Sequence, residues 1–389
     1  MSTHVNRRNF LEVGALSTLG IGTDFLKKPI HATQTASSSN DTNGSVQMFG
    51  DGLGLSPDEL AKLWTDLASD NRIERDSYSN GGSVEQLETT AAGILGKERA
   101  IFMPTGTLAN HLAVRALAAG KGTVAVQAES HLFNDSGDCV QRLSNLPLIP
   151  LGDNNASFTL EELEHAADRT QNGRVQGDIS VISIETPVRR KFGETFEPEH
   201  LNQVIDFAHR NKIRLHLDGA RIFLQAAYEK RSVAEYAAPF DTVYVSLYKY
   251  FNAPSGAILA GPRSLLDNMF HTRRMFGSGL PAAWPFAAIA NHYMPGFIQR
   301  YQEAISASKQ WLVEISRHEA FAAEQIPNGT NLMRLHVAGN AHRFRQNLQN
   351  RGIQIGPPRA NNQFLIAINE TWNRQTPTDL VRAFVSSLA

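Results

Sequence analysis

The residues with the clearest chemical potential are an acid and an amine that follow two strand-like runs. Ile213–Leu217 is short, apolar and partly β-branched, which predicts a buried strand ending at Asp218. A second such run, Thr242–Leu247, ends just before Lys249. If both strands belong to one parallel sheet, they bring the two side chains to the edge at which open α/β sheets bind ligands.

An acid and a lysine on one edge match the requirements of pyridoxal 5′-phosphate (PLP). The carboxylate keeps the pyridine nitrogen protonated, so the ring can accept electrons from a bond broken at the substrate Cα. The lysine forms a Schiff base with the aldehyde until an amino acid displaces it. An isolated aspartate or lysine is more often a solvated turn residue. It is the combination that predicts catalytic roles for Asp218 and Lys249.

A strand, a turn and a helix earlier in the chain could hold a phosphate. Ala100–Met103 predicts a short strand, and Leu108–Ala118 predicts a helix. The free N–H groups at the start of a helix bind anions, so the amides of Gly106 and Thr107 and the Thr107 hydroxyl could hold the phosphate. By itself the segment also fits an ordinary helix capped by Thr105 or Thr107.

The remaining pattern supplies the elements that must position these groups. Runs with strand character alternate with runs of helical period, which predicts a parallel sheet with helices on both faces. The further predicted strands are Thr123–Val126, Leu148–Leu151, Ile179–Glu185 and Ala257–Ala260. The further predicted helices are Pro57–Ser69 with Ser56 as its cap, Val84–Leu95, Leu160–Thr170 and Glu199–Arg210.

The motif around Asp218 resembles a known family. The segment Leu215–Phe223 contains His-x-Asp-Gly-Ala-Arg, and Lys249 follows it at the interval seen in threonine aldolases and β-eliminating lyases. The resemblance runs from Met48 to the C-terminus. It implies the aspartate-aminotransferase-like PLP fold (fold type I), with a large, mainly parallel sheet domain over residues 48–290 and a small C-terminal α/β domain over 291–389. We also consider that the N-terminal helix joins the small domain.

The resemblance implies PLP as cofactor and assigns residues that hold it. Gly106 and Thr107 stand at the position of the phosphate loop. His131 follows the predicted strand Thr123–Val126 and stands where relatives stack a histidine on the pyridine ring to position water or a proton. Arg274 resembles a basic residue that in relatives approaches the phosphate of a neighbouring subunit, although a solvated helix end fits it equally well.

The resemblance also indicates how a substrate carboxylate is held. Relatives use the arginine of the motif, here Arg221, with a serine and a C-terminal arginine. The serine position reads Gly50, and the C-terminal position falls in the apolar run Phe364–Ile366. An unpaired carboxylate in a partly desolvated cleft is costly, and a bidentate arginine answers it best. We therefore expect Arg221 to carry most of the contact and Arg189 or Arg190, after a predicted strand, to supply the second.

Three positions bear on the substrate. Tyr78 aligns with an active-site tyrosine of the family, although a loop aromatic packed on the surface fits it as well. The family segment Arg-Ser-Asp-Thr falls at residues 49–52, where only the acid, Asp51, is retained. The family pattern Glu-Asn-Thr-His falls at Glu185-Thr186-Pro187, so the histidine that faces the substrate hydroxyl in relatives is missing. This last difference weakens an assignment to threonine itself.

The reaction implied is that of a PLP-dependent carbon–carbon lyase. It cleaves L-threonine or a related β-hydroxy-α-amino acid to glycine and an aldehyde, with Lys249, Asp218 and His131 as catalytic residues. A β-eliminating lyase acting on another amino acid is the nearest alternative, because the bond held perpendicular to the ring decides the path. A catalytically silent PLP-fold binding protein is a third possibility. The joint presence of lysine, acid, histidine and phosphate turn argues against it.

Composition excludes several other classes of protein. The formal net charge of −1 over 389 residues argues against nucleic-acid binding driven by charge. The single cysteine, Cys139, excludes an intrachain disulfide framework and a multi-cysteine metal site, and we expect no metal. No apolar run has the length of a membrane-spanning helix. The resemblance implies a homodimer or homotetramer whose active sites use both subunits, acting on a small amino acid.

The N-terminus predicts export. Asn6–Leu11 resembles a twin-arginine signature, and Val13–Gly22 after it is weakly apolar. Ala32 could end a cleavage site, which predicts a signal peptide over residues 1–32 and a Ser/Thr/Asn-rich linker over 33–47. The mature enzyme would then be periplasmic, without a membrane partner. A disordered tail with a chance Arg-Arg pair is the alternative, and the enzyme would then be cytoplasmic.

Overall fold

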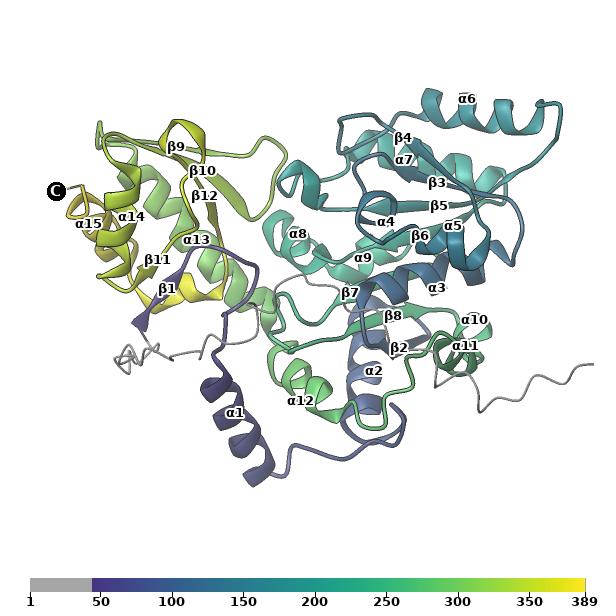
Figure 1. The fold of residues 1–389 in the computed structure, drawn as a ribbon, viewed down its shortest axis with the longest axis horizontal. Coiled ribbons are helices and arrows are strands. Elements are labelled where there is room, and N and C mark those ends of the chain that lie inside the picture. Colours follow the sequence, from purple (N-terminus) through teal and green to yellow (C-terminus); the bar gives the residue numbers. More distant parts are fainter. Residues whose placement is uncertain (1–43, 389) are drawn as a thin grey trace, which may run out of the picture. The chain divides into compact units, whose positions relative to one another are not determined.

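The computed structural model describes residues 44–388, and its largest sheet has seven strands in the order β2-β8-β7-β6-β5-β3-β4 (Figure 1). All neighbours pair in parallel except β8, which is antiparallel to both β2 and β7. The strands are β2 (Arg99–Met103), β3 (Thr123–Gln127), β4 (Leu148–Leu151), β5 (Ile179–Glu185), β6 (Arg214–Asp218), β7 (Thr242–Ser246) and β8 (Ala257–Gly261). The predicted large, mainly parallel sheet is confirmed.

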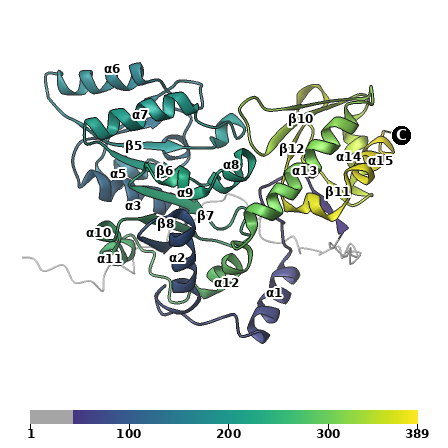
Figure 2. The ribbon, with the colours of Figure 1, turned by 180° about the vertical axis from the view of Figure 1, so that it is seen from behind.

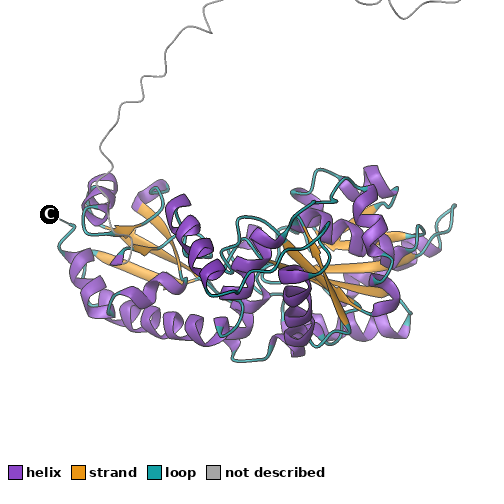
Figure 3. Ribbon diagram, turned by 90° about the horizontal axis from the view of Figure 1, so that it is seen from below, coloured by secondary structure: helices purple, strands orange, loops and turns teal. Residues whose placement is uncertain are grey.

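The strands of this sheet are buried on both faces, as expected for parallel strands covered by helices. In β7, Val243 and Val245 pack into the core that includes Leu224 and Phe223 of helix α8, whereas Tyr244 packs into a second core that includes Leu112 of α3. The two cores lie on opposite faces because neighbouring residues of a strand point in opposite directions. Helices accordingly flank the strands on both sides in Figure 3.

The helices of this part follow the predicted pattern closely. They are α2 (Gly82–Leu95), α3 (Gly106–Ala118), α4 (His131–Asn134), α5 (Cys139–Ser144), α6 (Leu160–Gln171), α7 (Pro198–Arg210), α8 (Ile222–Glu229), α9 (Val233–Ala237), α10 (Arg263–Leu266), α11 (Met269–Met275) and α12 (Trp284–Tyr293). Helices α6 and α7 lie side by side in both Figure 1 and Figure 2. Helix α3 begins earlier than predicted, because the Thr105 hydroxyl accepts a hydrogen bond from the N–H of Leu108 and caps it.

The C-terminal residues form a smaller antiparallel sheet in the order β12-β10-β9. Its strands are β9 (Phe321–Gln325), β10 (Leu332–Val337) and β12 (Gln363–Ala367), and its helices are α13 (Phe297–Ile315), α14 (Ala341–Gln349) and α15 (Pro377–Val385). The described residues also contain the short 3₁₀ helices η3 (Arg189–Lys191), η4 (Ala360–Asn362) and η5 (Glu370–Arg374). None of the helices within residues 44–388 combines the length and the hydrophobicity needed to cross a bilayer.

The N-terminal segment joins this smaller sheet region through a strand rather than a helix. Strand β1 (Val46–Gln47) pairs in parallel with β11 (Ile353–Gln354), and Val46 is fully buried. Helix α1 (Pro57–Ser69) instead packs on α12, where the Trp64 indole N–H donates to the Pro285 carbonyl at 2.9 Å. The predicted Ser56 cap is present. The predicted signal peptide and most of the predicted linker lie outside the described residues, and the end of that linker is strand β1.

Strands β5, β6 and β7 end at the same edge of the large sheet. The register pairs Glu185 with Asp218 and Asp218 with Tyr244. Lys249 follows three residues after the last residue of β7, Ser246. The fold therefore brings an acid from each of two neighbouring strands to one edge of the sheet. The loop between β7 and β8 that carries Lys249, residues 247–256 and called the lysine loop below, reaches the same edge.

Candidate active site

Two adjoining cavities open at the carboxyl edge of the large sheet. The inner cavity has a volume of about 270 Å³ and contains the predicted phosphate turn, Asp218 and Lys249 in its lining. The outer cavity has a volume of about 730 Å³ and is lined by the N-terminal segment from Gln47 to Leu60 together with the lysine loop. The cavities share a wall formed by His131, Arg189, Arg221, Tyr248, Lys249 and Pro254.

A buried hydrogen-bonded chain holds Asp218 in the inner cavity. The Asn110 amide N–H donates to Asp218 Oδ2 at 2.5 Å, and the Ala220 backbone N–H donates to Oδ1 at 3.1 Å. The Asn110 oxygen lies 2.9 Å from Nε2 of His216, whose Nδ1 lies 2.8 Å from the Thr242 hydroxyl. Burial lowers the pKa of His216 to about 4, so the ring is neutral.

The neutral ring assigns the protons along this chain. Because Asn110 donates to the carboxylate, its oxygen must accept, and His216 therefore carries its proton on Nε2 and accepts from Thr242. Each of these side chains therefore donates a hydrogen bond in the direction of Asp218. The carboxylate retains lone pairs, and these suit the N–H of a protonated pyridine ring.

The phosphate turn approaches the sheet closely. A Cβ at Gly106 would lie 2.0 Å from the Tyr244 hydroxyl, so no larger residue fits there without a shift. The Ser255 hydroxyl donates to the Pro104 carbonyl at 2.8 Å and ties the lysine loop to the turn. The first amides of an α-helix have no partner within the helix. Those of Gly106 and Thr107 consequently suit a phosphate in the inner cavity.

The amine of Lys249 is prepared to react near neutral pH. Burial, and after it the charge of Arg221, lower the pKa of the amine to about 8. The N-terminal segment lies against this lysine, because a Cβ at Gly52 would come within 2.3 Å of the Lys249 carbonyl oxygen. The Leu53 N–H donates to Asn252 Oδ1 at 2.7 Å and holds the segment there. Glycine at residue 52 thus permits this close crossing.

Glu185 links the two loops that bound the inner cavity. Its carboxylate accepts from the His131 backbone N–H at 2.6 Å and from the Arg189 backbone N–H at 2.9 Å. Burial, followed by repulsion from Asp218, raises the pKa of Glu185 to about 7, although the two backbone donors favour the ionised form. Glu185 is 3% exposed, and its carboxylate holds the backbone of both loops in place.

His131 lies at the boundary between the cavities. It begins helix α4, and the Ser130 hydroxyl caps that helix by accepting from the Phe133 N–H. Its Nδ1 is buried and has no hydrogen-bond partner within residues 44–388. A buried ring nitrogen without a partner is uncommon in a folded protein, and His131 lines both cavities.

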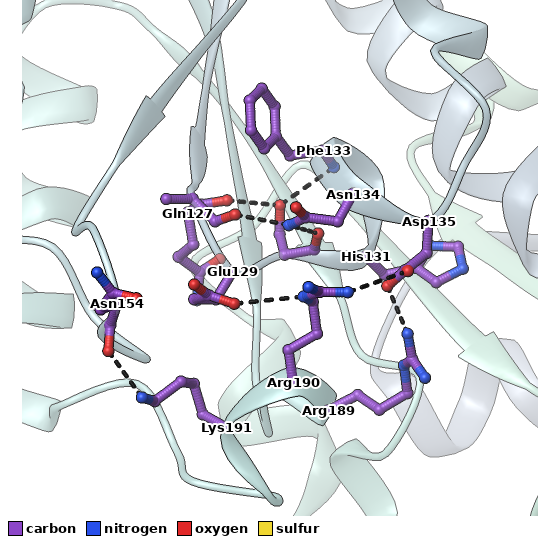
Figure 4. Close-up of polar contacts among 12 residues, drawn as sticks. Gln127, Glu129, His131, Phe133, Asn134, Asp135, Asn154, Arg189, Arg190 and Lys191 are labelled. Atoms are coloured by element: carbon purple, nitrogen blue, oxygen red, sulfur yellow. Dashed lines mark hydrogen bonds and ion pairs between the residues drawn. The ribbon is translucent and has the colours of Figure 1, made fainter.

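A cluster of ion pairs bounds the outer cavity beside His131, as Figure 4 shows. Arg189 pairs with Asp135 at 2.5 Å. Arg190 lies 3.3 Å from both Asp135 and Glu129. Arg189 lines both cavities, whereas Arg190 lines neither of them. Of the two arginines considered for a second carboxylate contact, the structure therefore brings Arg189 to the site and directs Arg190 to the neighbouring acids.

Arg221 also lies in the wall between the cavities, and Asp51 pairs with it at 2.7 Å. Burial acts against both charges. The pairing nevertheless leaves the pKa of Arg221 above its ordinary value, and Arg221 with Lys249 holds the pKa of Asp51 below its own. The Asn331 amide donates to Asp51 Oδ1 at 3.0 Å. Both members of the ion pair therefore stay charged in a largely buried place.

Tyr78 and Arg274 lie outside both cavities. The Arg274 guanidinium lies over the Tyr78 ring, 4.8 Å from its centroid, and the ring is 42% exposed. Tyr78 has a φ of 52° and lies in a tight turn in which the backbone N–H groups of Ser77 and Asn80 each donate to the other residue's carbonyl. Neither residue lines the inner or the outer cavity. Within one chain these two predicted site residues therefore lie together, apart from Lys249 and Asp218.

Sequence reasoning missed Asn110 and the role of Glu185. Asn110 follows Gly106 by one helical turn, so both lie on the same face of α3, and this spacing was a usable signal. Glu185 ends a predicted strand next to the one ending at Asp218, which placed it at the same edge. Neither carried a motif of its own, because a single Asn or Glu occurs too often to mark a site.

The residues of the inner cavity fit PLP. The lining of this cavity includes a buried carboxylate with spare lone pairs, a lysine with a lowered pKa and a helix N-terminus with free amides. The imidazole ring of His131, whose Nδ1 has no partner, lies at the boundary between the two cavities. These groups are the donor set that a phosphorylated pyridine aldehyde needs.

The chain is similar to several known proteins, and a family model matches most of it. The model of the β-eliminating lyase family matches residues 62–348. An alanine racemase, TOXG, from Cochliobolus carbonum is 31% identical over 53% of this chain, and the chain spans about half of that relative's length (52%). A low-specificity L-threonine aldolase from Escherichia coli is 28% identical over 67% of this chain and 77% of its own. A Listeria monocytogenes structure described as an L-allo-threonine aldolase is 25% identical, with a TM-score of 0.72, and the match covers 89% of this chain and 96% of that one.

Proposed function

Because the chain belongs to the β-eliminating lyase family, we propose that it is a PLP-dependent carbon–carbon lyase. Its proposed reaction cleaves L-threonine or a related β-hydroxy-α-amino acid to glycine and an aldehyde. The predicted fold type I architecture is confirmed, and PLP is the cofactor of the family. The observation that carries the proposal is the inner cavity, in which Asp218, Lys249 and the phosphate turn line one space.

PLP bound in the inner cavity would supply an electron sink for a bond broken at the substrate Cα. Asp218 would accept the pyridine N–H, and Asn110 would keep that carboxylate in place. Gly106 and Thr107 would hold the phosphate through their backbone amides. Lys249, with a pKa of about 8, would supply the amine that holds the aldehyde.

His131 is the proposed proton carrier for aldol cleavage. His131 lines both cavities and would accept the proton of a substrate β-hydroxyl, directly or through water. Glu185 accepts a hydrogen bond from the His131 backbone N–H and so fixes the position of the residue that carries the ring. Arg221 would bind the substrate carboxylate, and Arg189 would supply a second contact if it leaves Asp135.

The decisive experiment is a substrate panel assayed with two detectors. PLP is added to the purified protein, and the appearance of visible absorbance reports its covalent attachment. Threonine, allo-threonine and bulkier β-hydroxy amino acids are then assayed for aldehyde, and separately for ammonia with keto acid. Aldehyde and glycine support aldol cleavage. Ammonia with keto acid would replace it with β-elimination, and no absorbance would favour the silent binding protein.

Racemisation of a small amino acid is a second candidate. Thr186, Pro187 and Val188 occupy the place of the family histidine, are buried and carry no titratable group. The acid–base groups left in the inner cavity wall include Lys249, which could remove and return a Cα proton. The relative named alanine racemase makes this worth testing. Incubation with L-alanine in D₂O separates the two: loss of optical activity with deuterium at Cα supports the racemase.

We propose that the enzyme is a homodimer or homotetramer. Tyr78 and Arg274 lie against each other at an exposed place and outside the cavities of their own chain, which suits residues that serve a neighbouring copy. Light scattering coupled to gel filtration tests the assembly. A stable monomer that retains full activity would contradict it.

We propose that the chain is exported to the periplasm with its cofactor bound. The twin-arginine pair Arg7-Arg8 carries this proposal, and it lies outside the described residues. Replacing both by lysine keeps the charge but removes the guanidinium pair that the receptor reads. The variant should leave folded, PLP-loaded enzyme in the cytoplasm. Normal export of that variant would leave the cytoplasmic alternative.

A further inference from the structure

The ion pair between Asp51 and Arg221 is largely buried. The Asp51 and Arg221 side chains are 11% and 15% exposed, and Asp51 Oδ2 lies 2.7 Å from Nη2 of Arg221. The other oxygen of Asp51 accepts from the amide of Asn331, which is itself 2% exposed. Within residues 44–388, Asp51 is the only acid that pairs with Arg221. The arginine therefore has one fixed partner, and that partner is held from its far side.

The N-terminal segment does not need this ion pair to stay in place. On one side of Asp51, the Met48 N–H donates to the Gln354 carbonyl at 2.7 Å, and the Met48 carbonyl accepts from Ala367 at 2.9 Å. On the other side, Leu53 donates to Asn252 at 2.7 Å. The backbone on both sides is thus already anchored. The carboxylate is free to act on Arg221.

A guanidinium presents its N–H donors in a rigid fork, and a bidentate contact uses two of them at a defined angle. Asp51 engages Nη2, so it sets the plane of the Arg221 group and leaves further donors for another carboxylate. The orientation matters more here than in a site with several carboxylate ligands. Gly50 stands in place of a serine hydroxyl, and residues 364–366 are apolar where relatives have an arginine.

We infer that Asp51 is a positioning residue which, backed by Asn331, orients Arg221 towards the substrate α-carboxylate and so sets the preference for substrates that carry one. The inference rests on the proposed function, because it requires an amino-acid substrate. Asp51 also repels an incoming carboxylate. Arg221 stays cationic and screens the two carboxylates from each other. When Asp51 is removed, the substrate therefore loses more from the disordered Arg221 side chain than it gains from the lost repulsion.

The test compares glycine, the proposed product, with glycinamide, which has the same amine and no carboxylate. Dissociation constants for both are measured by calorimetry on the PLP-loaded parent and on Asp51→Asn. The variant should bind glycine about tenfold more weakly, the scale of one charge-assisted hydrogen bond, while glycinamide changes by less than about twofold. Glu370→Gln is the matched control, since it removes another largely buried acid from its arginine, Arg300, away from both cavities.

A charge swap separates positioning from a merely structural tie. In Asp51→Asn alone, an amide N–H faces either Arg221 or Asn331. Asp51→Asn combined with Asn331→Asp restores the hydrogen bond between residues 51 and 331 but moves the charge away from Arg221. The swap should recover the melting temperature of the parent and leave glycine binding weak. Recovery of glycine binding by the swap would overturn the inference.

Two further outcomes decide the remaining cases. Equal effects of Asp51→Asn on glycine and glycinamide, or no effect on either, overturn the inference while leaving the proposed function intact. A PLP-loaded parent that binds neither ligand overturns the proposed function and the inference with it. If Asp51→Asn does not fold, Asn331→Ala is used in its place, with the same direction and a smaller selective loss of glycine binding expected.

Discussion

The inner and outer cavities are built in different ways. The acids of the inner cavity, Asp218 and Glu185, end neighbouring strands and are 2% and 3% exposed, with backbone or buried side-chain donors on their oxygens. One ion pair of the outer cavity, Arg189 of η3 with Asp135 at the end of α4, is 48% and 24% exposed. Buried, fully partnered groups are costly to change. We infer that the inner cavity carries the shared chemistry and the outer cavity carries what can vary between substrates.

Among the tests of this comparison, Lys249→Ala should have the largest effect. Removing the amine should abolish turnover, because nothing else in the inner cavity can hold the aldehyde covalently. The fold should remain, and PLP should still bind without a covalent link through the phosphate turn. Turnover is measured with the best substrate of the panel. Lys191→Ala, which removes a lysine that lines neither cavity, is the matched control, and near-normal activity of Lys249→Ala would refute the assignment.

The next effect belongs to Asp218→Asn. An amide cannot keep the ring nitrogen protonated, so the barrier should rise by about 3–4 kcal/mol, a hundred- to thousandfold loss in kcat. The measurement is kcat under saturating PLP. Asp241→Asn controls for the general loss of an aspartate, because Asp241 precedes β7 at the opposite edge and pairs with Arg214. An unchanged kcat for Asp218→Asn would remove the inner cavity from the chemistry.

The arginine series compares a largely buried arginine of the shared wall with a half-exposed one. Arg221→Ala should raise KM by an amount equivalent to about 2–5 kcal/mol, because its charge partner stays buried. Arg189→Ala should cost about 0.2–1 kcal/mol, since that side chain is 48% exposed and screened by solvent. Arg190 lines neither cavity, so Arg190→Ala should have the KM of the parent. If Arg189→Ala also matches the parent in KM, the second carboxylate contact proposed for this loop is wrong.

The smallest effect is a pH dependence of cofactor loading. Only the unprotonated Lys249 amine reacts with an aldehyde, and its pKa is lowered to about 8. Loss of the proton therefore speeds loading as pH rises, by about fivefold from pH 7 to 8, and the rate levels above pH 8. Stopped reactions reduced with borohydride and analysed for labelled Lys249 give the profile. A rate that keeps rising towards pH 10 would indicate an ordinary lysine.

Continuity along the chain decided which of these features the sequence could predict. Asp218 ends one predicted strand and Lys249 follows another, and each strand is recognisable from a short stretch of sequence. Ligands bind at the carboxyl ends of parallel strands, so the sequence could place both residues at the same edge of the sheet. The spacing of Asn110 from Gly106 placed both residues on one face of α3, but the hydrogen bond from Asn110 to Asp218 joins segments far apart in the sequence and was not predicted. Arg189 and Arg190 are adjacent in sequence, yet only Arg189 lines the cavities. The direction of each side chain in the short turn η3 depends on Asp135 and Glu129, which lie on another loop.

The pairing of β1 with β11 has a consequence for how the enzyme is made. Residues 46–54 leave the ribosome well before their partners at residues 353–354 and 367. The large sheet can therefore assemble during synthesis, while the segment that carries Asp51 and Gly52 to Lys249 stays unpaired until those partners emerge. Until then the lysine is open to solvent from the side of the outer cavity. The natural moment for PLP to enter is this interval, before residues 46–54 close over Lys249.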